Sequence, residues 1–108
     1  MAGLGEFEQV VLLAILRLSE NAYAVTITDE IKHHTGRSPS PGALYTTLDR
    51  LEEKGFVRCK LGEPTSKRGG RAKRLFTVTR AGTIAIARAQ QSYRSLAQGL
   101  QLPEWNRA

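Results

Sequence analysis

Residues 40–55 read SPGALYTTLDRLEEKG, and this stretch contains the start, the buried face and the end of one helix. Ser40 is suited to cap the helix, and Pro41 fits its first turn, where a missing N–H does no harm. Three leucines recur at the spacing of a helical face and predict packing in a core. They are Leu44, Leu48 and Leu51. The flanks and outer side of the helix are left with Gly42, Tyr45, Thr46, Thr47, Asp49 and Arg50.

A shorter helix is expected just before this one, at residues 26–35. Thr26 and Asp29 resemble a capping box, and the apolar residues that follow are spaced i, i+4. Gly36 is a suitable stop, and a short polar turn leads into Ser40. Two short helices joined by a tight turn are typical of a helix-turn-helix.

The chain before this pair predicts a helix at residues 6–19 with apolar side chains on both sides. A domain of 108 residues has few spare surfaces that could cover both sides. We therefore expect one side to pack within the domain and the other to meet a second chain. The residues expected at that dimer interface are Leu12, Ile15 and Leu16.

The chain after the helix-turn-helix predicts two strands, at residues 56–61 and 73–78, because apolar and polar side chains alternate there. Residues 62–72 form a loop between them that is rich in Gly, Pro, Ser and basic residues. A hairpin directly after a helix-turn-helix makes a winged helix. The fold class expected is therefore mostly α with a two-stranded β-hairpin, a winged helix-turn-helix with a C-terminal dimerisation helix.

The positive charge of the chain is concentrated in this hairpin. The whole chain has a formal net charge of +6, and residues 58–74 hold seven basic residues against Glu63 alone. A solvated loop is the simpler interpretation of such a run. A cationic hairpin beside a helix-turn-helix instead indicates a polyanionic partner, with nucleic acid the first candidate and an anionic membrane surface the second.

A last helix is expected at residues 80–98, capped by Thr79. Its apolar residues follow a heptad seam, which could pair with a second chain or pack on the first helix of its own chain. The seam consists of Ile86, Ala89, Tyr93, Leu96 and Leu100. We expect a DNA-binding domain at residues 1–79, then a dimerisation helix and a loosely held tail with Trp105 at residues 80–108.

Direct contact with double-stranded DNA is expected from the third helix and the hairpin, because a helix fits the major groove and a basic hairpin can lie on the backbone. The candidates are Ser40, Gly42, Tyr45, Thr46, Thr47, Arg50, Lys67, Arg68, Arg71 and Lys73. Other roles remain open for some of them. Tyr45 could be half core, Arg50 could pair with an adjacent glutamate, and Ser40 is a helix cap first.

Chemistry other than binding has little support in the sequence. His33 and His34 are adjacent, so on a helix they diverge by about 100° and cannot share a metal. Cys59, expected on the inner face of a strand, is interpreted as an inert core thiol. No nucleotide-binding glycine loop or catalytic pair is present, so we expect no enzyme, no cofactor and no metal.

The setting expected is the cytoplasm. The longest apolar run has seven residues, whereas a membrane span needs about twenty, so no membrane is expected as a partner. The first residues include acidic side chains at positions where a signal peptide has basic ones, so we expect no secretion signal.

The chain resembles the PadR family of bacterial transcriptional regulators over nearly its whole length. The motifs that carry the resemblance are LGEFE at residues 4–8, AYAV at 22–25, SPGALYTTL at 40–48, RLEEKG at 50–55, GGRAKR at 69–74 and TVTRAG at 77–82. The family usually has Gly where this chain has Ala24, and commonly Pro where it has Arg80.

The resemblance implies a homodimeric winged-helix repressor on a palindromic operator, in a family whose members often release DNA when a small effector binds. It places helix contacts at Ser40, Gly42, Tyr45, Thr46 and Arg50, and wing contacts at Lys67, Arg68 and Arg71. Two other classes stay open. One is a winged helix that binds protein or RNA. The other is a small-molecule sensor dominated by a pocket at the dimer interface.

Overall fold

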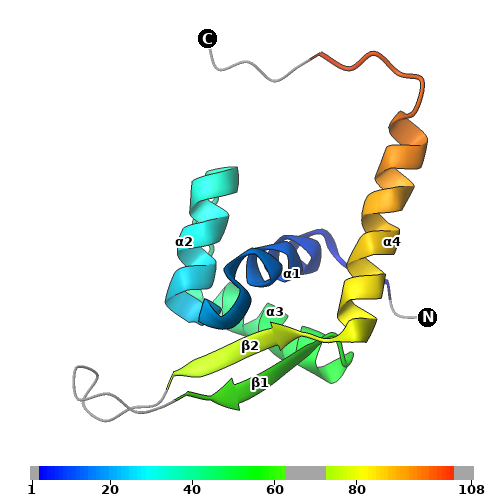
Figure 1. Cartoon of the computed structure of the whole chain (residues 1–108). Helices are drawn as coiled ribbons and strands as arrows, with labels where there is room; N and C mark the ends of the chain where they lie inside the picture. Colours follow the sequence, from blue (N-terminus) through cyan, green and yellow to red (C-terminus); the bar gives the residue numbers. More distant parts are fainter. Residues whose placement is uncertain (1–2, 63–72, 104–108) are drawn as a thin grey trace.

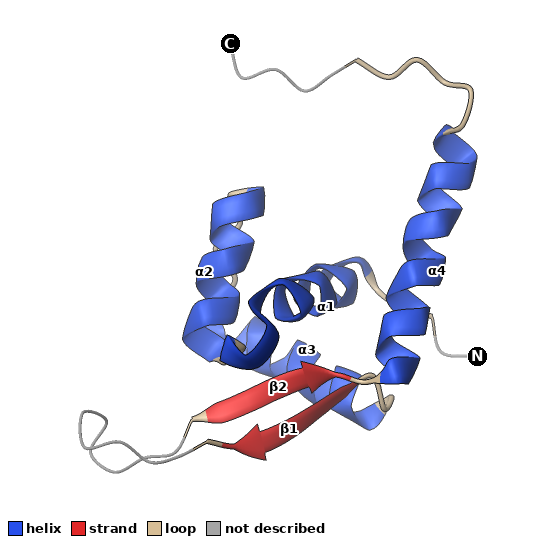
Figure 2. Cartoon of the chain, viewed as in Figure 1, coloured by secondary structure: helices blue, strands red, loops and turns tan. Residues whose placement is uncertain are grey.

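The computed structural model describes residues 3–62 and 73–103 of the chain. Helix α1 (Glu6–Leu18) leads through a 3-10 turn, η1 (Ser19–Asn21), into α2 (Ala24–Thr35) and α3 (Pro41–Glu53). The strands β1 (Val57–Leu61) and β2 (Arg74–Val78) follow, and α4 (Arg80–Ala97) is the last helix. Figure 1 shows the hairpin reaching out on the side opposite α4, and Figure 2 shows the same view by secondary structure. The expected order of elements is confirmed.

Two helices begin where local sequence signals predict. The Ser40 hydroxyl accepts a hydrogen bond from the Ala43 N–H at 3.1 Å, and Pro41 is the first residue of α3. At the start of α4, the Thr79 hydroxyl accepts from the Gly82 N–H, also at 3.1 Å. Each cap satisfies a backbone donor that a helix otherwise leaves without a partner.

Helix α2 begins two residues earlier than expected. Tyr23 is its N-cap, and the Tyr23 N–H donates to the Thr26 hydroxyl at 3.0 Å. Thr26 is therefore the third residue of the helix, and its side chain reaches back toward the cap. The expectation of a capping box that starts at Thr26 is wrong. The Thr26 hydroxyl accepts a hydrogen bond from the N–H of the cap residue Tyr23 and is not itself the cap.

The hydrophobic core forms around α1, which contacts α2, α3, β2 and α4. Helices α2 and α4 stand on opposite sides of it (Figure 1). The chain's own elements therefore cover most of the apolar side chains of α1: Leu12 and Ile15 are 0% and 1% exposed, whereas Leu13 is 39% exposed. The expected place of Leu12 and Ile15 at a dimer interface is corrected, because they have no surface left for a partner. Leu16 remains 43% exposed.

The strands pair antiparallel, from Val57 opposite Val78 to Leu61 opposite Arg74. Phe76 is buried and Cys59 is half-buried against the core, as the alternation predicts. Leu61 continues the alternation but is 68% exposed, because this end of the hairpin extends past the body. The Phe76 N–H donates to the Ala22 carbonyl at 2.8 Å and joins the hairpin to the connection between η1 and α2.

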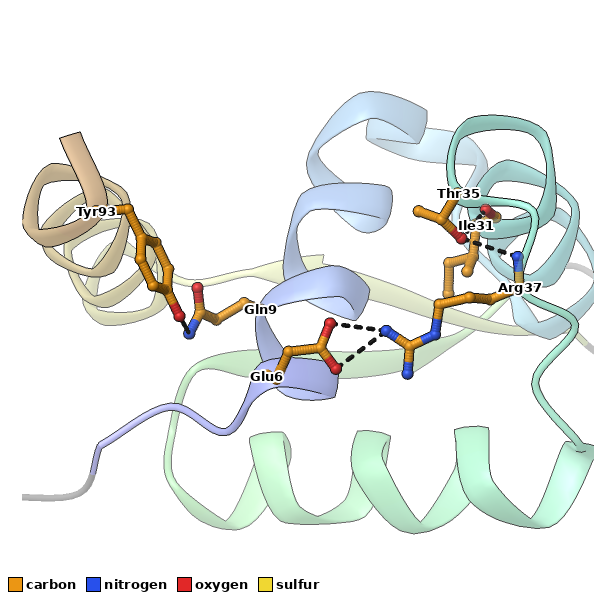
Figure 3. Close-up of polar contacts among 6 residues, drawn as sticks. All are labelled: Glu6, Gln9, Ile31, Thr35, Arg37 and Tyr93. Carbon is orange, nitrogen blue, oxygen red and sulfur yellow. Dashed lines mark hydrogen bonds and ion pairs between the residues drawn. The ribbon is translucent and has the colours of Figure 1, made fainter. Parts of the chain in front are cut away.

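Helix α4 is anchored at its base (Figure 1), and its second half contacts α1 through a hydrogen bond that Gln9 Nε2 donates to the Tyr93 hydroxyl at 3.4 Å (Figure 3). Gly82 is buried, and a Cβ at this position would overlap the carbonyl oxygen of Phe56. Ile86 is 3% exposed, so its expected role at a dimer interface is corrected: it packs in the chain's own core. Ala89 is half-buried, whereas Tyr93 and Leu96 are 55% and 79% exposed.

The expected seam does not run to its end within the helix. Helix α4 ends at Ala97, and Gly99 has a φ of +83°, a conformation in which the helix cannot continue. Leu100 therefore lies beyond α4, exposed, and is not on one helical face with Leu96. The alternative of packing on the chain's own first helix has support at two positions of the seam: Ile86 is buried in the core, and the Tyr93 hydroxyl accepts a hydrogen bond from Gln9 of α1.

Candidate nucleic-acid interface

Helix α3 has one buried face and one exposed face. Leu44, Leu48 and Leu51 are at most 1% exposed and fix the helix on the core. Most of the predicted contact residues of this helix are exposed: Ser40, Gly42, Tyr45, Thr46 and Arg50. Thr47 is the exception, with 7% exposure, because it lies one helical turn after Leu44 on the buried face. Its expected contact with DNA is corrected.

The end of α3 is tied to the start of α1 by an ion pair. The Lys54 ammonium lies 2.8 Å from both carboxylate oxygens of Glu8 and also donates to the Gly3 carbonyl at 3.0 Å. Burial of the Glu8 carboxyl favours its neutral form. The hydrogen bonds from Lys54 and from the Gly5 N–H outweigh burial and lower the pKa of Glu8 below its ordinary value.

The turn between α2 and α3 is tied to α1 as well (Figure 3). Arg37 Nη1 donates to both carboxylate oxygens of Glu6, at 3.0 and 2.7 Å, and the guanidinium lies over the Phe7 ring. The Arg37 N–H donates to the Thr35 hydroxyl, which itself donates to the Ile31 carbonyl. These contacts link the turn between α2 and α3 to the first turn of α1, in addition to the buried leucines that fix α3 on the core.

For two predicted contact residues on α3 the sequence left another role open: an ion pair for Arg50 and partial burial for Tyr45. Arg50 forms no ion pair with Glu52 or Glu53 within 4.0 Å in the part of the chain that the structure describes, and its side chain is exposed. Tyr45 is 40% exposed and, with Val25, lines a hollow of about 330 Å³ between α2 and α3. The Tyr45 ring therefore has one side on the body and one side open.

The hairpin carries basic residues on its described strands. Arg58 and Lys60 of β1 are exposed. Arg74 instead turns to its own chain, where its Nε donates to Cys59 Sγ at 3.4 Å and its Nη2 lies 3.9 Å from Glu52. The contact with Cys59 raises the pKa of the Arg74 guanidinium. Arg58 and Lys60 were absent from the predicted contact set, although alternation with Val57 and Cys59 already placed them outward.

The remaining predicted wing contacts are Lys73, directly before β2, and three residues of the segment between the strands. Lys73 is half-buried, and its ammonium lies 4.2 Å from the centroid of the Tyr23 ring. The predicted contacts Lys67, Arg68 and Arg71 lie outside the described residues. No pattern in the sequence indicated that Tyr23 and Lys73 meet, because residues fifty apart are brought together only by the fold.

A metal site has no support among residues 3–62 and 73–103, where no group of three or more His, Cys, Asp or Glu residues gathers. His33 and His34 meet edge to face, 4.8 Å between ring centroids. His34 Nε2 lies 3.0 Å from Glu30, which also accepts a hydrogen bond from Arg17. No helix in these ranges is both apolar and long enough to span a bilayer.

A helix-turn-helix followed by an antiparallel hairpin packed beside it defines a winged-helix protein. The sequence matches the transcriptional regulator PadR-like family over residues 12–88, which is more than half of the chain. The chain belongs to this family of transcriptional regulators, which is a DNA-binding and non-enzymatic class. The resemblance inferred from the sequence and the expectation of no enzyme are thereby confirmed.

Individual relatives agree with this assignment. The chain is 36% identical over 72 residues to the transcriptional regulator Rv3488 of Mycobacterium tuberculosis, a match that covers 67% of this chain and 63% of that protein. The chain thus spans less than two thirds of the length of this relative.

Two solved structures show the same fold. A PadR-like transcription factor from Bacteroides fragilis superposes with a TM-score of 0.73 at 23% identity, covering 85% of this chain and 84% of that one. F93 from STIV, a winged-helix DNA-binding protein, gives a TM-score of 0.68 at 14% identity, covering 86% and 92%.

Proposed function

We propose that this chain is a homodimeric repressor that binds a palindromic DNA operator through α3 and the hairpin. The observation that carries this proposal is the exposed face of α3, whose small, hydroxyl and guanidinium groups suit base edges and phosphates. The other face of the same helix is buried by three leucines, so the exposed face is presented from a fixed support.

Helix α3 and the hairpin are proposed to make different kinds of contact with DNA. Gly42 and Thr46 allow close approach of α3 to the groove, and Arg50 reaches a guanine edge or a phosphate. Tyr45 and Ser40 add hydroxyl contacts. The hairpin, with Arg58, Lys60 and the predicted contacts in its loop, supplies attraction to the backbone that does not depend on sequence.

The uncovered part of α4 supports a dimer. Leu96 is 79% exposed on the second half of this helix, and the Tyr93 ring is 55% exposed although its hydroxyl accepts a hydrogen bond from Gln9 of the same chain. Exposed apolar side chains that lie close together favour an interaction surface. The proposed dimer surface consists of Leu16, Ala89, Tyr93, Leu96 and the exposed Leu100 beyond the helix. A two-fold axis there would place two copies of α3 in successive major grooves, about 34 Å apart, and the bound dimer would block polymerase.

A groove beside α4 supports control of this binding by a small molecule. It has a volume of about 510 Å³ and lies between residues 3–4, Phe56 and the first turns of α4. Its lining is mostly apolar, with Arg88 as the charged group. A small molecule with an apolar body and one negative charge could fill this groove, with its charge near Arg88, and would contact the base of α4. Titration of the protein–DNA complex with such compounds, using Arg88→Ala as the control, tests this part of the proposal.

The central experiment selects binding sites from a pool of random DNA duplexes and sequences the retained fragments. The expected result is an inverted repeat whose half-sites are one helical turn apart. Binding to it should weaken by about 10³–10⁵ between about 50 and 200 mM salt if roughly 6–10 phosphates are neutralised. No retention of duplex DNA at low salt would contradict the proposal. Preference for a folded RNA, or a flat salt response, would favour the other binding classes.

A further inference from the structure

The side chains of Tyr23 and Lys73 join the helix-turn-helix to the outer end of the two paired strands. The Lys73 ammonium lies 4.2 Å from the centroid of the Tyr23 ring, within the range in which a cation is attracted to the face of an aromatic ring. Tyr23 is the N-cap of α2, and Lys73 is the residue directly before β2. The contact therefore links the N-cap of the first helix of the helix-turn-helix to the outer end of the paired strands.

Both partners project from anchored backbone. The Tyr23 N–H donates to the Thr26 hydroxyl at 3.0 Å. The Lys73 carbonyl accepts from the Gly62 N–H at 2.7 Å, which extends the ladder by one bond beyond the paired strands. These bonds fix the backbone at both positions, so only the side-chain torsions of Tyr23 and Lys73 have to be ordered when the contact forms.

The outer end of the hairpin has few ties to the body in the described part of the chain, and one of them is the exposed pair of Arg74 with Glu52, whose Nη2–Oε1 distance is 3.9 Å. A two-stranded sheet is only marginally stable by itself. Phe76 anchors the middle of β2 through burial and its bond to Ala22, but Leu61 and Arg74, the last pair of the ladder, are exposed. Lys73 lies one residue beyond that pair. Its contact with Tyr23 is thus the outermost tie between hairpin and body in the described part of the chain.

We propose that Tyr23 is a positioning residue for DNA binding: through Lys73 it sets the direction in which the hairpin leaves the body relative to α3. This inference rests on the proposed function and deepens it. With the contact in place, α3 and the hairpin are already spaced to engage one duplex. Without it, the hairpin samples several directions, and binding has to order it first, which weakens affinity.

The test replaces residue 23 with phenylalanine and with phenylalanines that carry one, two or three ring fluorines. Fluorine withdraws negative charge from the ring face while the shape of the ring changes little, so the attraction for Lys73 falls stepwise. Tyr23→Phe should bind the selected operator as wild type does. Each added fluorine should weaken binding, by about three- to tenfold in total. Equal affinity across the series would overturn the proposal.

Variants of Lys73 are the second part of the test. They separate loss of the contact with the Tyr23 ring from loss of one positive charge. Lys73→Arg keeps a cation for the ring and should stay near wild type, while Lys73→Gln should weaken binding. In the Lys73→Gln background the fluorine series should have a smaller effect, because the part of it that acts through Lys73 is gone. A series that weakens binding there as much as it does with Lys73 in place would also overturn the proposal. Wild-type protein that fails to bind any duplex overturns the proposed function itself, a result distinct from either of these.

Discussion

The ammonium of Lys54 lies 2.8 Å from each carboxylate oxygen of Glu8, so the last turn of α3 and the first turn of α1 share one ion pair. The Glu8 side chain is 8% exposed and that of Lys54 is 26% exposed. Removal of one partner would leave the other charge partly buried without compensation, a costly state in a folded protein.

Glu8→Gln should therefore destabilise the fold by about 1–3 kcal/mol, less than for a fully buried pair because Lys54 keeps some solvent. Urea unfolding at pH 7 measures this loss. Glu6→Gln is the matched control: it also removes a carboxylate from the first turn of α1, but Glu6 is 69% exposed in its pair with Arg37. The control should change stability by at most about 1 kcal/mol. Equal losses in both variants would contradict the assignment.

The same carboxyl should make stability depend on pH in acid. The pKa of Glu8 is lowered in the folded protein, so the unfolded chain takes up a proton at higher pH than the folded one. The contribution of Glu8 is complete above its unfolded pKa of about 4.3 and is lost as the pH falls through its folded pKa. The wild-type melting temperature should therefore decrease more steeply below about pH 5 than that of Glu8→Gln. Parallel curves would refute this origin of acid sensitivity.

Alanine at Gly42 and alanine at Gly82 should change the stability of the protein in opposite directions. At Gly42, a Cβ would meet nothing within 4 Å, so Gly42→Ala should raise helix stability by up to about 1 kcal/mol. The new methyl group would stand on the face proposed to approach DNA, and operator binding should weaken by about tenfold.

Gly82→Ala serves as the counterpart. Its Cβ would overlap the Phe56 carbonyl oxygen and lie 2.9 Å from Val78 Cγ1, so this variant should lose about 1–3 kcal/mol of stability. Thermal melts and a binding assay on both variants separate the two roles. A stabilised Gly42→Ala protein that binds with wild-type affinity would show that α3 does not approach the duplex at this position.

Substitutions on α3 and in the hairpin loop should change binding in different ways. Arg50→Ala or Thr46→Ala should alter which base is preferred at one operator position, with a loss of about 1–3 kcal/mol on the best site. Arg68→Ala with Arg71→Ala should weaken all duplexes alike and reduce the salt dependence. Lys32→Ala removes an exposed positive charge at the other end of the helix-turn-helix and is the charge control. Unchanged affinity of the loop variant at low salt would refute the assignment of the hairpin.

Leu96→Lys should shift the oligomeric state toward monomer, because a charge would replace the most exposed large apolar side chain of α4. Sedimentation velocity over a range of concentrations measures the change. Leu61→Lys alters an apolar residue of similar exposure on β1, away from the proposed dimer surface, and should leave the oligomeric state as it is. Monomeric wild-type protein would rule out the dimer.

Sequence alone predicts the elements well where the signals are local. Ser40 with Pro41 and Thr79 each mark a helix start, and the structure shows both caps. Thr26 misleads because a hydroxyl near a helix start can serve either as the cap or as the acceptor for the cap's own N–H. The two cases differ by the backbone conformation of Tyr23, which the sequence pattern does not show.

Burial is harder to predict where it depends on packing between distant elements. Leu12 and Ile15 have the composition of an interface, yet β2 and α4 join α2 and α3 in covering α1. Thr47 could have been placed from its spacing, one turn after Leu44 and one before Leu51, but its hydroxyl suggested an exposed residue. The contacts of Lys73 with Tyr23 and of Lys54 with Glu8 join positions about fifty residues apart, and no local pattern predicts such pairs.

The hydrogen bond from the Gly62 N–H to the Lys73 carbonyl is the outermost bond of the hairpin ladder in the described part of the chain. It fixes the positions at which the chain leaves β1 and enters β2. We therefore expect that exchanging residues 63–72 for those of another regulator would keep the register in which Val57 lies opposite Val78. Such a graft would change the basic residues proposed to contact DNA while the helices stay unchanged.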